Sequence, residues 1–296
     1  MVELSWCQNL GEVASLVEGR VSLRHWKFKE NQKKDPAQNP WLLWVHGWGE
    51  HSGRYNEFAN YLGHFGLADI VAPDLPGYGR SRAEGGCKRL LGLDEQVLVL
   101  KQILGQMAGK GGLFENRPLF LGGHSMGSLI CLDLIRGGLP PGVSCQRAFF
   151  SSVSFEIAVP IPTYKQKALD FLNVVNKDFS FPNGELVTSQ VSYDCANVGE
   201  YDGDPWMHGL VSARWLNSMR ETSARICKEA SKFSTPLSIA CGGDDPTISI
   251  KAQEDFFNSL PASLNKRFLK IPQAKHEILF DINRERLFRS VVSWFL

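Results

Sequence analysis

The chain has 296 residues, and its 32 Lys and Arg residues nearly balance its 31 Asp and Glu residues, so we expect no nucleic-acid partner. The length suits one α/β domain with a large core, and no apolar stretch is long enough to span a bilayer. The seven cysteines are scattered without a C-x-x-C pair and the start lacks a signal peptide, which together favour a soluble, cytoplasmic protein.

Strand and helix patterns alternate over the first half of the chain, as is typical of a parallel sheet with crossover helices. Continuous or alternating apolar runs predict strands, and apolar positions three or four residues apart predict helices. The expected strands are 21–28, 41–45, 68–72, 118–121 and 147–155, and the expected helices are 55–65, 93–107 and 129–135.

The alternation stops near residue 156, in a stretch with prolines, scattered aromatics, a weak helix at 165–175 and no clear strand. It resumes with strands at 236–241 and 267–271 and helices at 250–260 and 284–295. We therefore predict an α/β fold with a mostly parallel central sheet and helices on both faces. Its core would be 1–155 and 216–296, and 156–215 would be an inserted cap, or lid, over the edge where ligands bind.

The sequence Gly123-His124-Ser125-Met126-Gly127 lies between an expected strand and an expected helix. In this context G-x-S-x-G is typical of a nucleophile elbow, a tight turn that exposes a serine hydroxyl. The glycines are required because a Cβ at either flanking position would crowd a strained turn. We predict Ser125 as the nucleophile, and the alternative is a glycine-rich turn with a capping serine.

A serine nucleophile needs a histidine base, and in this type of fold the chain order is serine, acid, histidine. Only His208 and His276 follow Ser125 in the sequence. His276 lies in the loop after the final expected strand, whereas His208 lies in the expected cap. We therefore predict His276 as the base.

The acid should follow a strand between the nucleophile and the base, so that it can fix the histidine tautomer. Asp245 is the expected acid, in the turn Gly242-Gly243-Asp244-Asp245-Pro246 after the strand 236–241. Its neighbour Asp244 is one alternative. Glu156, after the preceding strand, is the other.

Two backbone N–H groups should bind the oxyanion of the reaction. We predict Met126, directly after the nucleophile, and Trp48, in the loop His46-Gly47-Trp48-Gly49 after the strand 41–45. A phosphate-binding turn is the alternative for this loop, but G-x-x-x-x-G-K-[ST] does not occur. H-E-x-x-H and cysteine pairs are absent too, so we expect neither a metal nor a cofactor.

These motifs, with the loop 73–81, resemble the α/β-hydrolase fold from about residue 20 to the C-terminus. The segment 46–55 reads H-G-W-G-E-H-S-G-R-Y and is similar to H-G-x-G-E-H-S-x-R-Y of the monoacylglycerol lipase and lysophospholipase branch. The resemblance implies an apolar acyl tunnel under the cap and a polar headgroup pocket near Glu50, Arg54 and Tyr201. The alternative for Glu50 and Arg54 is a structural ion pair that fixes the oxyanion loop.

We therefore predict a serine carboxylester hydrolase that cleaves single-acyl lipids or similar small esters. Trp48 is bulky where comparable lipases carry a small residue, which favours short to medium acyl chains. The alternatives are an acyltransferase that uses the same acyl-enzyme and a non-catalytic ligand receptor on a hydrolase scaffold. The resemblance also implies transient contact between the cap and a membrane surface.

Overall fold

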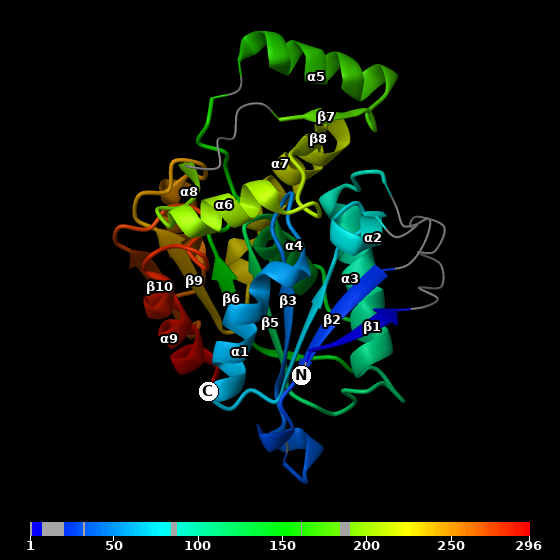
Figure 1. The fold of residues 1–296 in the computed structure, drawn as a ribbon, viewed down its shortest axis with the longest axis vertical. Helices are drawn as coiled ribbons and strands as arrows, with labels where there is room; N and C mark the ends of the chain where they lie inside the picture. The colour runs from blue at the N-terminus through cyan, green and yellow to red at the C-terminus, as the bar shows by residue number, and fades with distance from the viewer. Residues whose placement is uncertain (1, 8–20, 32, 84–87, 161, 184–189) are drawn as a thin grey trace.

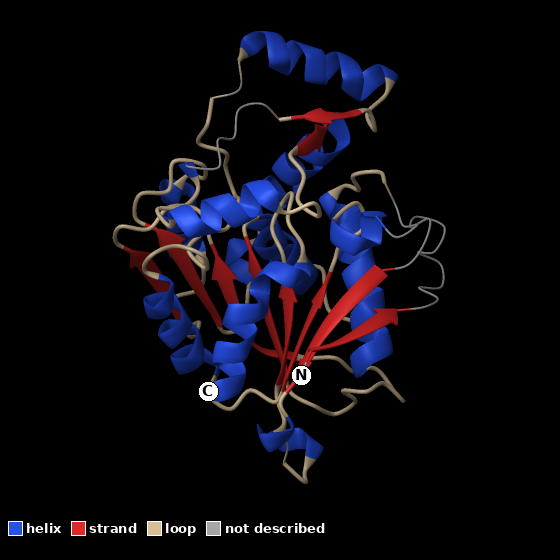
Figure 2. Cartoon of the chain, viewed as in Figure 1, coloured by secondary structure: helices blue, strands red, loops and turns tan. Residues whose placement is uncertain are grey.

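An eight-stranded sheet forms the centre of the computed structural model (Figures 1 and 2). The strand order is β1-β2-β4-β3-β5-β6-β9-β10. The pairs β1–β2 and β2–β4 are antiparallel and the remaining pairs are parallel, which confirms the predicted mostly parallel sheet. The structure describes residues 2–7, 21–31, 33–83, 88–160, 162–183 and 190–296.

From β3 onward, helices separate the successive strands of the large sheet, as crossover connections between parallel strands require. The strands of the large sheet are β1 (Val2–Cys7), β2 (Val21–Lys27), β3 (Trp41–Val45), β4 (Asp69–Pro73), β5 (Leu119–His124), β6 (Cys145–Ser151), β9 (Leu237–Gly242) and β10 (Lys266–Ile271). The helices that lie wholly or mostly outside residues 156–215 are α1 (Asn56–His64), α2 (Gly79–Ala83), α3 (Leu93–Ala108), α4 (Met126–Arg136), α7 (Ala213–Lys228), α8 (Ile250–Ser259) and α9 (Arg284–Phe295).

Strand β3 contributes to two apolar cores, one on each face of the sheet. Trp41, Leu43 and Val45 pack with residues of α3, α4 and α7 on one face. Leu42 and Trp44 pack with residues of α1 and α9 on the other. Side chains of a strand alternate between faces, so a continuous apolar run is what a strand covered on both sides requires.

The stretch 156–215 lies above the carboxyl ends of the parallel strands (Figure 1). It contains α5 (Thr163–Val175), which was expected, and α6 (Cys195–Gly203), which was not. The expectation of no strand here is wrong, because β7 (Ser180–Pro182) and β8 (Leu210–Ser212) form an antiparallel pair. Each of these strands has only three residues, too few for an alternating pattern to stand out.

Helix α7 also has no counterpart among the expected helices, and it runs through the expected boundary between residues 215 and 216. Ser212 caps its first turn by accepting a hydrogen bond from Trp215 N at 3.2 Å. Its buried face packs against α4, α3 and α5, so one helix links the core to the cap.

Parts of the predicted core and cap (1, 8–20, 32, 84–87, 161 and 184–189) lie outside the described residues, and Cys87 is among them. In the part of the chain that the structure describes, Cys131, Cys145, Cys195, Cys227 and Cys241 are free thiols. Within the same part, no helix combines the length and apolar character needed to cross a bilayer.

Candidate active site

Ser125 occupies a strained turn between β5 and α4. Its φ is 51° and its ψ is −115°, a left-handed region that non-glycine residues rarely adopt. A Cβ on Gly123 would lie 2.6 Å from the Gly127 carbonyl carbon, and one on Gly127 would lie 2.2 Å from Val45 O. Only glycine therefore fits at either side of this serine, as the elbow pattern requires.

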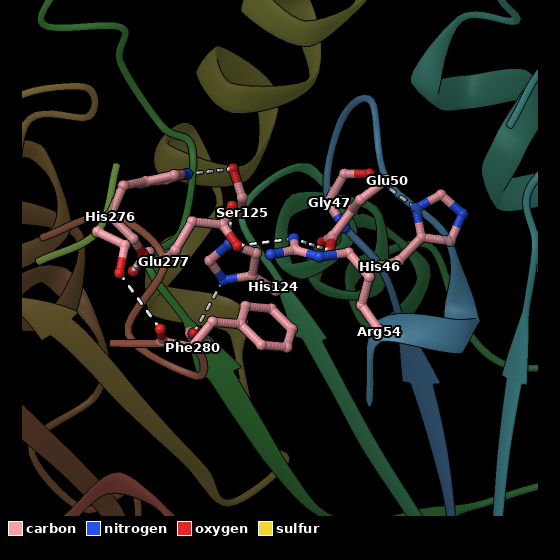
Figure 3. A network of polar contacts seen from close by, with 12 residues as sticks. His46, Gly47, Glu50, Arg54, His124, Ser125, His276, Glu277 and Phe280 are labelled. Carbon is pink, nitrogen blue, oxygen red and sulfur yellow. Dashed lines mark hydrogen bonds and ion pairs between the residues drawn. The ribbon is translucent and has the colours of Figure 1, made fainter. Parts of the chain in front are cut away.

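The structure brings Ser125, His276 and Asp245 together at the carboxyl edge of the sheet (Figure 3 shows the serine and the histidine). His276 Nε2 is 2.9 Å from Ser125 Oγ, and His276 Nδ1 is 2.8 Å from Asp245 Oδ2. All three side chains are buried, so little water competes for these hydrogen bonds. In this geometry the imidazole can accept the serine proton while the carboxylate stabilises the cation that forms.

Asp245 is further fixed by backbone amides, and it accepts N–H groups from Thr247 at 2.8 Å and Ile248 at 3.0 Å. Burial raises the pKa of Asp245, but His276 and these two amides outweigh burial and hold it below its usual value. Burial lowers the pKa of His276, but Asp245 reverses this effect and the net shift is upward. The pair therefore favours an ionised acid beside a basic imidazole.

The residues weighed against Asp245 and His276 as acid and base make other contacts. Asp244 is exposed and accepts the hydroxyl of Tyr193 at 3.2 Å. Glu156 is exposed at the end of the segment that follows β6. His208 donates from Nε2 to Gly77 O at 2.9 Å, and burial lowers its pKa to about 4. None of these contacts involves Ser125.

The loop after β3 passes beside Ser125, and Gly47 and Trp48 line the same cavity as Ser125 and Met126. Met126 opens α4, so its backbone N–H has no carbonyl partner within the helix. His46 holds this loop in place through both ring nitrogens. Its Nε2 accepts the Leu75 N–H at 2.9 Å, and its Nδ1 donates to Gly47 O at 2.7 Å.

The Trp48 side chain joins this loop to the cap. Its Nε1 donates to Leu210 O at 2.8 Å, and its ring packs 5.7 Å from that of Trp215. One residue further on, Gly49 O accepts the backbone N–H of His208 at 2.9 Å. Gly49 has a φ of +79°, and a Cβ there would lie 2.5 Å from His208 O. The cap and the loop are therefore in close backbone contact.

An apolar cavity of about 360 Å³ opens above Ser125, within the size range of small-molecule sites. Its walls come from the core, from α5, from β7 and β8 and from α7. The apolar lining includes Trp48, Met126, Ile157, Leu169, Phe181, Val211, Trp215, Leu216 and Met219. Tyr201 and Glu277 add polar groups to this lining.

Of the three residues expected at a headgroup pocket, Tyr201 lines this cavity. Glu50 and Arg54 are absent from its lining among the described residues, and they form an ion pair at 2.7 Å behind it. Glu50 also accepts Gly47 N–H at 2.5 Å. This contact favours the structural interpretation of Glu50, in which the carboxylate fixes the loop.

His124 and Glu277 also belong to the site, although no sequence motif predicts a role for them (Figure 3). His124 Nδ1 is 3.0 Å from Ser151 Oγ, and its Nε2 is 3.4 Å from Glu277 Oε1. Both flank expected site residues in sequence, and this adjacency is the signal that could have identified them.

His124, His276 and Glu277 also bring potential metal-ligand atoms within 4.8 Å of one another. Both ring nitrogens of His276 already have partners in Ser125 and Asp245, and both of His124 have partners in Ser151 and Glu277. A metal here would have to replace these hydrogen bonds, so the cluster fits a proton-transfer site better than a ligand set.

The sheet order, the elbow and the inserted cap define an α/β-hydrolase. Residues 37–283 match the family described as serine aminopeptidase S33, and the chain belongs to this family. It is 31% identical to human monoglyceride lipase over 82% of this chain and 80% of that protein. It is 27% identical to phospholipase YtpA of Bacillus subtilis, over 84% of this chain and 92% of that one.

A longer abhydrolase domain-containing protein of Dictyostelium discoideum is 25% identical over 93% of this chain, which spans only 27% of its length. Among solved structures, the monoacylglycerol lipase of Paleococcus ferrophilus superposes with a TM-score of 0.75 at 24% identity. That match covers 92% of this chain and 97% of the other. The chain is thus a hydrolase similar to monoglyceride lipases.

Proposed function

We propose that the protein is a serine carboxylester hydrolase that cleaves single-acyl lipids or similar small esters through an acyl-Ser125 intermediate. One observation carries the proposal: Ser125 Oγ lies 2.9 Å from His276 Nε2, at the wall of an apolar cavity. A serine paired with a buried imidazole can act as a nucleophile, and an apolar cavity beside it can hold an acyl chain.

The proposed reaction has two halves. His276 Nε2 takes the proton of Ser125 as Oγ attacks the ester carbonyl, and Asp245 stabilises the imidazolium. His276 then gives this proton to the alcohol oxygen, which leaves as the ester bond breaks. In the second half His276 deprotonates a water molecule, which attacks the carbonyl carbon of the acyl-serine. The bond between this carbon and Ser125 Oγ then breaks, His276 returns the proton to Oγ, and the carboxylic acid leaves.

The backbone N–H groups of Trp48 and Met126 are the proposed donors to the oxyanion. The helix start at Met126 and the approach of the Gly47-Trp48 loop to the same cavity support this assignment. A donor fixed before the reaction stabilises the developing charge without reorganisation, and one such donor is worth roughly 2.7–4 kcal/mol.

The apolar lining supports a substrate with an acyl chain, and Tyr201 supports a polar group beside the ester. Trp48 reduces the space near the nucleophile, so we propose short to medium chains as the preferred substrates. Similarity to a monoglyceride lipase and a phospholipase supports the lipid class. It does not choose between glycerol and phosphate headgroups.

We also propose that the cap touches a lipid surface through α5. Lys165, Ala168 and Leu169 of this helix line the cavity, while Phe171 and Val174 are 66% and 85% exposed on it. Exposed apolar side chains on a helix that also lines an apolar cavity suit interfacial contact. Phe171→Glu should weaken sedimentation with phosphatidylcholine vesicles, whereas Leu113→Glu, at an exposed apolar residue outside the cap, should not.

A fluorophosphonate probe and a substrate panel test the proposal. The probe should label the wild type and fail to label Ser125→Ala, and that variant should lose about 10⁴-fold or more in kcat on p-nitrophenyl esters. The panel contains monoacylglycerols, lysophospholipids and aminoacyl p-nitroanilides, with and without glycerol as acceptor. Turnover of the anilides alone would indicate a peptidase, and ester products of glycerol would indicate acyl transfer.

A further inference from the structure

Arg54 lies between two buried carboxylates that belong to different loops (Figure 3). Its Nη1 donates to Glu50 Oε2 at 2.7 Å and to Glu277 Oε2 at 2.8 Å. These three side chains are 8% exposed or less. Taken by themselves, one cation and two carboxylates carry a net negative charge in a place with little water, where charges interact strongly.

The guanidinium of Arg54 also contacts two aromatic rings and a side-chain amide. It lies 4.0 Å from the ring centre of Phe280 and 5.2 Å from that of Tyr201, and its Nη2 donates to Asn197 Oδ1 at 3.1 Å. A guanidinium stacked on aromatic rings and paired with two carboxylates has little freedom to reorient. Binding a substrate headgroup instead would break pairs that are costly to break when buried.

Each carboxylate holds a different part of the site. Glu50 Oε1 accepts Gly47 N–H and the Tyr55 hydroxyl, both at 2.5 Å, and so fixes the loop that contains Trp48. Glu277 directly follows His276 and fixes the base loop. Arg54 therefore links the loop beside the oxyanion to the loop that presents the base, although the two are more than 200 residues apart in sequence.

Several charged or titratable groups face His276. Asp245 comes from the loop after β9, Glu277 from the same loop as His276, and Glu50 from the loop after β3. The ring of His124, at the end of β5, lies 5.1 Å from the His276 ring. Burial raises the pKa of Glu277, but Arg54 and His124 reverse this effect and lower it, which favours the ionised carboxylate next to His276.

We propose that Arg54 and Glu277 are positioning residues, which hold the base loop and the oxyanion loop in one arrangement and supply a negative charge that His276 faces. The inference rests on the proposed function, since it takes His276 to be the base. It differs from the headgroup-binding role that the resemblance implies for Arg54, because the arginine acts on the reaction through the two carboxylates.

The first test is the pH dependence of kcat/KM for a soluble p-nitrophenyl ester. Glu277→Gln keeps the shape and an acceptor oxygen but removes the charge that favours protonated His276. The acid limb should move to lower pH by about one unit. Glu57→Gln is the matched control, because Glu57 is an exposed acid that pairs with Arg284, and its limb should stay in place.

The second test separates kcat from KM. Arg54→Met releases both carboxylates and should lower kcat by roughly 10- to 100-fold through misplacement of the reacting groups, with little change in KM. Arg54→Lys keeps a cation between the carboxylates and should recover part of kcat. A rise in KM at unchanged kcat for Arg54→Met would show that Arg54 binds substrate and would overturn the proposal.

Probe labelling and the pH profile of the wild type distinguish a failure of this inference from a failure of the proposed function. If the wild type is labelled at Ser125 and has an acid limb that Glu277→Gln does not move, the positioning role is wrong and the hydrolase remains. If the wild type is neither labelled nor active on any ester, the proposed function itself fails. Thermal unfolding of Glu277→Gln and Arg54→Lys near the wild-type temperature shows that the variants are folded.

Discussion

Asp244 and Asp245 are neighbours in the chain, but their carboxylates have different partners. Asp245 is 8% exposed and bonds to His276, whereas Asp244 is exposed and accepts a hydrogen bond from the Tyr193 hydroxyl. Gly242 lets this turn lie close to the loop that contains His276, since a Cβ there would lie 2.1 Å from Lys275 O. The effects of substituting the two aspartates can therefore be compared directly, because only Asp245 contacts His276.

Asp245→Asn should therefore damage catalysis far more than Asp244→Asn. An asparagine at position 245 loses the charge and favours the wrong imidazole tautomer, which costs up to about 10⁴-fold in kcat in serine proteases. Asp244→Asn should stay within a few-fold of the wild type. Steady-state kinetics on one ester measures both, and an inactive Asp244→Asn would assign the acid to the other residue.

Activity should rise with pH through one ionisation, because His276 must be neutral to accept the Ser125 proton. The folded-state pKa of His276 is raised, so the loss of activity on acidification should begin above the ordinary histidine value of about 6.5. A pH–rate profile from 5 to 9 tests this, and a flat profile would remove His276 from the role. Treatment with EDTA should leave the rate unchanged.

Trp48→Ala should improve long-chain esters relative to short ones. The indole lines the cavity beside Ser125 and packs against Trp215, so its removal opens space for more methylene groups. Apolar pockets discriminate by ~1–3 kcal/mol, which corresponds to a change of tens of fold in the ratio of kcat/KM values. Trp206→Ala, at a tryptophan that lines a different groove, is the control. An unchanged chain-length profile would contradict the role of the ring.

Gly127→Ala should destabilise the fold by about 1–3 kcal/mol, because the new methyl group would meet the backbone oxygens of Val45 and His46. Gly199→Ala is the matched control, since a Cβ at Gly199 in α6 meets nothing within 4 Å. It should be neutral or stabilising by up to about 1 kcal/mol. Thermal unfolding compares the two, and equal unfolding temperatures would show that β3 and α4 can move apart.

The sheet could be predicted from the sequence because its signals are local. The run Trp41–Val45 is strand β3 itself, and the glycines around Ser125 define the turn that the backbone adopts. Helix α7 also carries a local signal, the capping Ser212, which the irregular composition before it obscured. The paired strands β7 and β8 depend on each other across the cap, so neither has a local pattern.

The side-chain network around the site could not be predicted in the same way. Ser125, Asp245 and His276 follow the chain order typical of one fold, so their proximity is expected once the fold is. Arg54 and Glu277 pair across 223 positions, and no spacing rule links them. Long-range pairs of buried charges are set by the packing of whole elements, which a single sequence does not contain.

The hydrogen bond from Trp48 Nε1 to Leu210 O has a consequence for protein engineering. The residue proposed to bind the oxyanion through its backbone is held by the cap through its side chain. Gly49 is held through its backbone carbonyl, which accepts the N–H of His208. Exchanging the segment 208–210 for that of a relative, or trimming the cap, would therefore also alter the electrostatics of the reaction centre. Cap chimeras made to change substrate choice should be assayed for kcat on a substrate too small to touch the cap.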